Sequence, residues 1–212
     1  MTNTTICPST ILARVKLILT NPAGCWTIIS GENKSAKELQ MSYTLPLVVA
    51  AALAGALGMQ VFGVSMGLLG TWRPTIGVTI STLVSQTVMG IAFPLISALI
   101  VQKVAAFFNG SATFDKAYSW IVYSSTPCLV GGLLNIYPPL GGLASFLGGI
   151  AALYIYFKGI PSMVNIAAEK QVVFFISVFV AGLVVAVGIS FLMGVLLLTT
   201  PTGLDPSMLT PR

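Results

Sequence analysis

The sequence contains no histidine and very little charge. Only 7% of its 212 residues are charged, whereas a typical soluble domain carries about 25%, and 56% are hydrophobic. A water-soluble chain with so few charges could not cover its own surface, and the apolar residues gather in long runs that a soluble core does not need. Lipid is therefore the expected solvent for most of this protein.

Cysteines and catalytic motifs are also scarce. The three cysteines, Cys7, Cys25 and Cys128, form no CxxC pair, which argues against a metal or haem site in a chain that has no histidine. The sequence has no Walker motif and no pair of acids within one apolar run. We therefore expect no catalytic residue, no cofactor and no enzyme. Lipidation of Cys7 or Cys25 near the membrane is an alternative for these thiols.

The apolar runs predict an all-α, polytopic bundle of five transmembrane helices. Three runs exceed the roughly 20 residues that cross about 30 Å of hydrocarbon, but the third and fourth are shorter. Pro138 and Pro139 separate those two runs, so a re-entrant hairpin is an alternative to two full crossings. Pro94 and Pro127 are predicted to kink their helices. The expected spans cover residues 44–69, 75–101, 118–134, 140–157 and 172–198.

The membrane domain, residues 44–198, lies between a cytoplasmic segment, residues 1–43, and a short disordered tail, residues 199–212. Within the first segment, residues 11–19 have the spacing of an amphipathic helix. This helix is expected either to lie in the headgroup plane or to pack on the cytoplasmic end of the bundle. Trp26 follows it and is predicted to anchor the chain at the headgroups.

The basic residues predict the orientation. If the N-terminus is cytoplasmic and the C-terminus outside, eight of the ten Lys and Arg residues face the cytoplasm, and Arg73 and Arg212 face outside. The net charge of +5 therefore indicates membrane topology, and we expect no nucleic-acid partner. The eight are Arg14, Lys16, Lys34, Lys37, Lys103, Lys116, Lys158 and Lys170.

Small residues recur every four positions in three of the runs. This spacing lets two helix backbones approach closely, so it predicts packing faces within the chain or between two copies in a homo-oligomer. The fifth run has the longest such face. The stripes are Ala50, Ala54 and Gly58; Gly141, Ser145 and Gly149; and Gly182, Ala186, Ser190 and Gly194.

Polar side chains are few within the runs, and none is charged. Gln60, Ser81, Ser85 and Gln86 are candidates for a polar seam that lines a small pore or solute path. The alternative is structural, because hydroxyl and amide groups in membrane helices usually bond to backbone carbonyls or to a neighbouring helix.

Several short motifs follow one another along nearly the whole chain. In order and spacing they resemble the bacterial branch of the Yip family, five-span membrane proteins described as interacting with Ypt/Rab GTPases. The motifs are Asn21–Pro22, Trp26–Ile29, Asn109–Gly110, Phe114–Ala117, Tyr123–Pro127, Ile136–Pro138, Leu153–Gly159 and Met163–Lys170.

The resemblance implies a non-enzymatic scaffold, adaptor or membrane-organising protein with a cytoplasmic protein partner. Eukaryotic members lie in Golgi and endoplasmic reticulum membranes and usually have a longer N-terminal segment, so the bacterial cytoplasmic membrane is the expected location and those organelles are the alternative. The candidate functional residues within the matching motifs are Pro22, Trp26, Asp115, Tyr123, Ser124, Thr126, Pro127 and Gly159.

Two other functions are weighed against this one. A small-solute or ion transporter, or a channel, would be lined by polar residues of the second and third spans. A membrane-embedded enzyme would need Glu32, Asp115 and Glu169 to meet in one cytoplasmic pocket.

Overall fold

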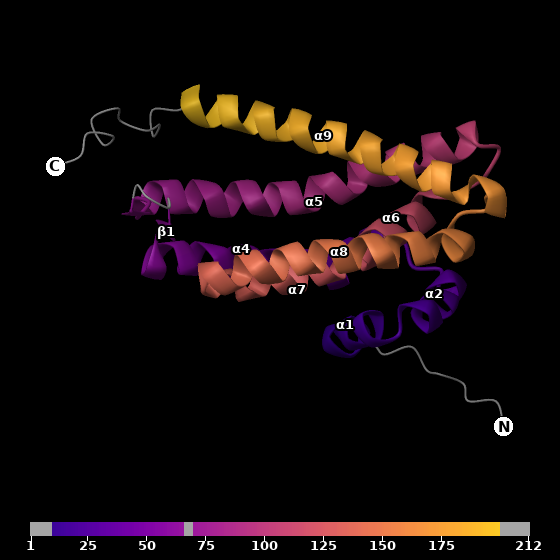
Figure 1. Cartoon of the computed structure of the whole chain (residues 1–212), viewed down its shortest axis with the longest axis horizontal. Helices are drawn as coiled ribbons and strands as arrows, with labels where there is room; N and C mark the ends of the chain where they lie inside the picture. The colour runs from indigo at the N-terminus through magenta and orange to yellow at the C-terminus, as the bar shows by residue number, and fades with distance from the viewer. Residues whose placement is uncertain (1–9, 66–69, 200–212) are drawn as a thin grey trace.

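The computed structural model describes residues 10–65 and 70–199, which are almost entirely helical (Figure 1). Within these residues, four helices are long and apolar enough to cross a membrane. The all-α membrane fold is therefore confirmed, whereas five separate spans are not. The long helices are α4 (Leu45–Phe62), α5 (Ile76–Phe107), α8 (Pro138–Met163) and α9 (Gln171–Thr199).

The first predicted span, to residue 69, is too long, because α4 ends at Phe62. Gly63 follows in the left-handed conformation, with φ of 75°, which glycine adopts without strain. The strands β1 (Val64–Ser65) and β2 (Thr71–Trp72) then pair antiparallel before α5 begins. Residues 66–69, at the end of the predicted span, lie outside the described residues.

The third predicted span is two helices, α6 (Phe114–Ser124) and α7 (Thr126–Leu133), followed by a short 3-10 turn, η3 (Leu134–Ile136). They break at Ser125, two residues before Pro127, which has no N–H to continue the backbone ladder. The hydroxyl of Ser125 donates to the carbonyl of Val122 at 2.9 Å, and this satisfies an acceptor at the break.

Helix α8 is longer than the predicted fourth span. It continues past Lys158 and Pro161 to Met163, so it extends beyond the apolar run that defined the prediction. Because α8 alone is long enough to cross, a hairpin in which both helices dip only partly through the bilayer does not match its length. A 3-10 turn, η4 (Ala168–Lys170), leads into α9.

The N-terminal helices pack on one end of the bundle (Figure 1). Arg14 and Ile18 are buried there, whereas Leu12 is 82% exposed. The amphipathic helix therefore packs on the bundle, and a position in the headgroup plane stays a prediction. Cys7 and the tail from residue 200 lie outside the described residues. The elements are α1 (Ile11–Thr20), α2 (Pro22–Gly31), α3 (Ala36–Leu39) and a π-helix, η1 (Gln40–Thr44), that leads into α4.

Glycines permit close backbone contacts between α7 and α8. A Cβ on Gly131 would lie 2.7 Å from the carbonyl oxygen of Ala144, and one on Gly148 would lie 2.5 Å from that of Pro127. A Cβ on Gly149 or Gly182 would meet nothing within 4 Å. Gly149 and Gly182 therefore pack against no described helix of the same chain, and the other alternative for their stripes, contact with a second copy, stays a prediction.

Gly148→Ala should destabilise the protein, because the new methyl group overlaps the backbone of α7. We expect a loss of about 1–3 kcal/mol, the range for an overpacked core. Gly149→Ala, the next position in the same helix, is the matched control and should be neutral or slightly stabilising. Unfolding of both purified variants in mixed detergent micelles measures the difference, and equal midpoints would contradict this packing.

Candidate functional site

A buried arginine joins the N-terminal helices to the bundle. Arg14 is only 4% exposed, and its two terminal nitrogens donate to the carboxylate of Glu32 at 3.0 and 2.9 Å. Nη1 also donates to the hydroxyl of Tyr123 at 3.0 Å, and the guanidinium lies 5.1 Å from the centre of that ring. A charge is tolerated in the interior when it is paired in this way. The contact therefore fixes α1 and the end of α2 against α6.

A second set of buried hydroxyl groups ties the π-helix η1 to α6 and α7. Tyr43 and Thr126 share a hydrogen bond of 2.8 Å, and Thr44 and Tyr118 share one of 3.1 Å. The Tyr118 hydroxyl also donates to Oε1 of Gln40. The Tyr43 ring meets the Tyr123 ring edge-on at 5.1 Å, so the two sets are continuous. Single π-turns in helices often mark functional sites.

Two tryptophans pack against one glycine at the same end. Trp26 donates its indole N–H to the carbonyl of Ile155 at 3.1 Å, and Trp120 donates to that of Tyr156 at 2.9 Å. A Cβ on Gly159 would lie 2.6 Å from the Trp120 ring and 2.8 Å from the Trp26 ring. The rings fit because residue 159 has no side chain.

The prediction that Trp26 anchors the chain at the headgroups is wrong. The side chain is 2% exposed, and its polar N–H has a backbone partner inside the protein. Pro22 has a local role, because it is the first residue of α2, where Asn21 caps the helix by accepting the N–H of Gly24 at 3.0 Å.

Asp115 links two helix beginnings. It lies in the first turn of α6, and its Oδ1 accepts the N–H of Ala36, the first residue of α3, at 2.7 Å. A carboxylate is favoured at the positive end of a helix. Glu32 is paired with Arg14, and no group of three His, Cys, Asp or Glu side chains that could hold a metal ion occurs among the described residues.

The candidate polar seam does not form one path through the bundle. Gln60 donates to the carbonyl of Pro74 at 3.2 Å and contacts the Thr79 hydroxyl, so it closes the hairpin between α4 and α5. Gln86 is exposed and lies opposite Gly55. Ser81 and Ser85 are half-buried on α5.

The structure thus brings most of the candidate motif residues to one end of the molecule. Trp26 contacts Gly159, Tyr123 contacts Arg14, and Thr126 contacts Tyr43. The sequence patterns did not identify their partners Arg14, Glu32, Tyr43 and Trp120. An arginine on the apolar side of a short helix was the available signal for the first of these, but nothing in a single sequence identifies its acceptor.

A comparison with protein-family models matches residues 16–189 to the Yip1 domain, which covers most of the chain. No curated protein and no solved structure matches it. The matched stretch begins within α1 and ends within α9. It therefore includes Glu32 and Tyr123, which bind Arg14, together with both tryptophans and Gly159.

Arg14→Met should destabilise the protein by about 1.5–3 kcal/mol, because it removes the guanidinium from the half-buried Glu32 carboxylate, whose other ion-pair partner, Lys34, lies 3.5 Å away. Lys16→Met, an exposed position in the same helix, is the control and should change stability by less than about 0.5 kcal/mol. The measurement is unfolding in mixed micelles. If the two variants unfold at the same detergent composition, the ion pair does not hold the N-terminal helices.

Proposed function

Because the chain belongs to the Yip1 domain family, we propose that it is a multi-pass membrane scaffold that binds a protein partner through the cytoplasmic end of its bundle. The observation that carries this proposal is the buried network of Arg14, Glu32 and Tyr123. It holds two short helices in a defined position at one end of the membrane helices, where they form a fixed surface rather than a loose arm.

In this proposal α6 and α7 together make a fifth crossing. Asp115, near the start of α6, bonds to Ala36 at the beginning of the helix that contains α4. At the other end, Tyr137 contacts Phe62, the last residue of α4, with ring centres 5.1 Å apart. Residues 114–136 therefore run the length of α4, and in helical form they cover ~34 Å, enough for the hydrocarbon core.

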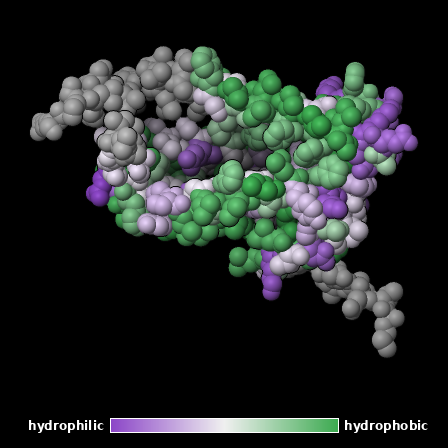
Figure 2. All heavy atoms as spheres, in the orientation of Figure 1, coloured by the Kyte–Doolittle hydropathy of each residue, from purple (hydrophilic) through white to green (hydrophobic). Residues whose placement is uncertain are grey.

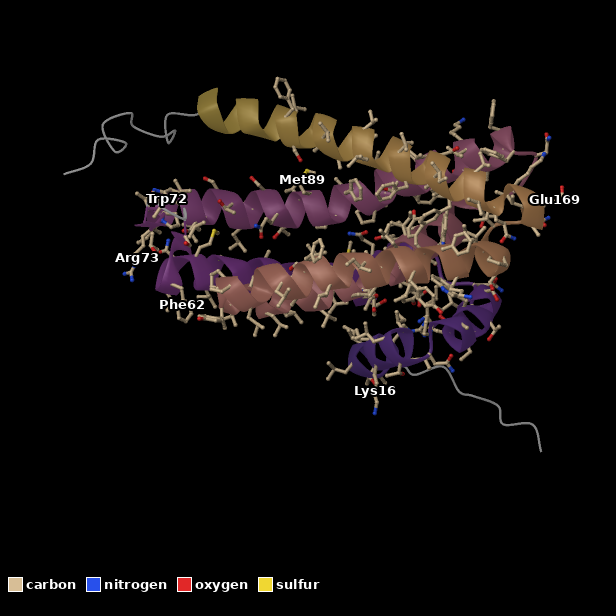
Figure 3. The ribbon with its side chains drawn as sticks, viewed as in Figure 1. Lys16, Phe62, Trp72, Arg73, Met89 and Glu169 are labelled. Carbon is tan, nitrogen blue, oxygen red and sulfur yellow. The ribbon has the colours of Figure 1, made fainter. Side chains whose placement is uncertain are left out.

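The charges support a cytoplasmic N-terminus. Figure 2 shows hydrophilic residues gathered at one end of the molecule, and Figure 3 shows Glu169 at that end with Arg73 at the other. The apolar side chains between them are exposed along α4, α5, α8 and α9, as a lipid environment requires. Five crossings then leave the C-terminus outside.

The proposed docking surface consists of exposed charged residues around the network. These side chains are on different elements that meet at this end, so a partner would recognise their arrangement and not one linear segment. They are Lys37 and Glu38 on α3, Lys116 on α6, and Glu169 and Lys170 on η4.

Helix α1 supplies a membrane contact in this scheme. Leu12 and Leu19 are exposed, and Lys16 points away from the bundle (Figure 3). Apolar and basic side chains that are both exposed on one short helix suit the boundary between headgroups and acyl chains. The proposed location is the bacterial cytoplasmic membrane, and the alternative remains the Golgi or endoplasmic reticulum.

Single cysteines in a variant without the three native cysteines test the topology. A membrane-impermeant maleimide added to intact cells should label Thr71→Cys in the β1–β2 hairpin and should reach Lys37→Cys and Glu169→Cys only after permeabilisation. Labelling of all three from outside would overturn the orientation. A cysteine at residue 205 should label like Thr71→Cys, and protection there would exclude five crossings.

A photoreactive amino acid tests the docking surface in living membranes. At Lys37 or Lys116 it should form adducts with a defined protein at yields at least about tenfold above those at Thr71 on the other end, as a cytoplasmic contact requires. Reversing the charges of Lys116 and Lys170 should lower that yield. The scaffold proposal would be contradicted by equal adduct yields at Lys37, Lys116 and Thr71. It would also be contradicted if reversing the two lysine charges left the adduct yield unchanged.

A further inference from the structure

A cavity of about 280 Å³ lies between five helices, on the far side of α6 from the network. Its lining is almost wholly apolar, and the residues come from α5, α6, α7, α8 and α9. It is open on one side. The surface is indented between α9 and α8 in Figure 2, and exposed apolar side chains such as Leu153 and Leu183 form its rim. The opening therefore faces acyl chains.

Two buried serines line this cavity without a hydrogen-bond partner. Ser97 on α5 is 6% exposed and Ser124 on α6 is fully buried, and neither hydroxyl oxygen has a partner within the described residues. Most serines in membrane helices bond to a carbonyl one turn earlier. A buried hydroxyl that makes no such bond is unfavourable unless another group supplies one.

The depth of the serines limits what that group can be. Ser97 lies six residues before the exposed Lys103 in α5, which places it ~9 Å along the helix from the charged end. In the proposed topology, which places Lys103 at the headgroups, this depth is just below them, close to the ester linkages of glycerolipids. An ester carbonyl accepts hydrogen bonds, and a serine hydroxyl can turn among three staggered positions to donate one.

We propose that the cavity binds an ester-linked acyl chain of a membrane glycerophospholipid, with the chain between α8 and α9 and its carbonyl accepting from Ser97 or Ser124. Gly182 supports this assignment. This residue lines the cavity, and a Cβ there would meet nothing within 4 Å. Glycine at this position therefore leaves space in the cavity and is not required for contact with a neighbouring helix.

The probes are two phosphatidylglycerols with a diazirine midway along one chain, one ester-linked and one ether-linked. The purified protein is reconstituted into phosphatidylethanolamine–phosphatidylglycerol vesicles, and labelled peptides are identified by mass spectrometry. The label should concentrate on residues 93–100 and 178–186. The ester probe should label them about fivefold more than the ether probe, the effect of one hydrogen bond.

Three variants make the test specific. Gly182→Leu should lower labelling of these segments about tenfold by filling the cavity, whereas Gly188→Leu, where a Cβ also meets nothing within 4 Å, should leave it unchanged. Ser97→Ala combined with Ser124→Ala should reduce the ester probe to the level of the ether probe.

Equal labelling of the Gly182→Leu and Gly188→Leu variants, or label spread evenly over the exposed faces of α4 and α8, would overturn the site. Equal labelling of the unmodified protein by ester and ether probes would overturn the role of the serines. That comparison needs no variant, so it holds even if a substitution prevents folding.

Discussion

The guanidinium of Arg14 decides how the N-terminal helices lie on the membrane domain. Inside a protein an arginine cannot be neutralised, so it must be surrounded by acceptors, and here these are the Glu32 carboxylate and the Tyr123 hydroxyl. The three residues come from α1, the end of α2 and α6, and few relative positions of those elements satisfy all the bonds together. The indole contacts at Gly159 then hold α2 and α6 against α8.

Helix α6 lies between the hydrogen-bond networks and the apolar cavity. Tyr118 and Tyr123 bond to the η1 and Arg14 networks, while Ser124, the next residue, lines the cavity. The helix breaks at the next residue, Ser125, and the hydroxyl of Thr126 forms a hydrogen bond with that of Tyr43. A lipid chain in the cavity and a protein at the proposed docking surface would therefore touch opposite sides of one short helix, which is buried along most of its length.

Several local features were predictable because they depend on single residues or on runs. The long apolar runs indicated membrane helices, and Pro127 indicated the break that separates α6 from α7. The candidate motif named Trp26, Tyr123, Thr126 and Gly159, which do lie at one end of the bundle, and the family model that matches residues 16–189 agrees with the resemblance. Helix lengths were less predictable, because α8 continues beyond its apolar run.

By itself the sequence determined that this protein lives in lipid, that its elements are helices, and which end carries the charge, since these follow from composition and from runs along the chain. Only the tertiary structure decided which partner each residue meets. Gly148 and Gly149 are chemically identical neighbours, yet one touches the backbone of α7 and the other faces open space. Trp26 resembled an interfacial anchor and is a buried donor. Periodicity shows which residues share a face, but what lies opposite that face depends on helices distant in the chain.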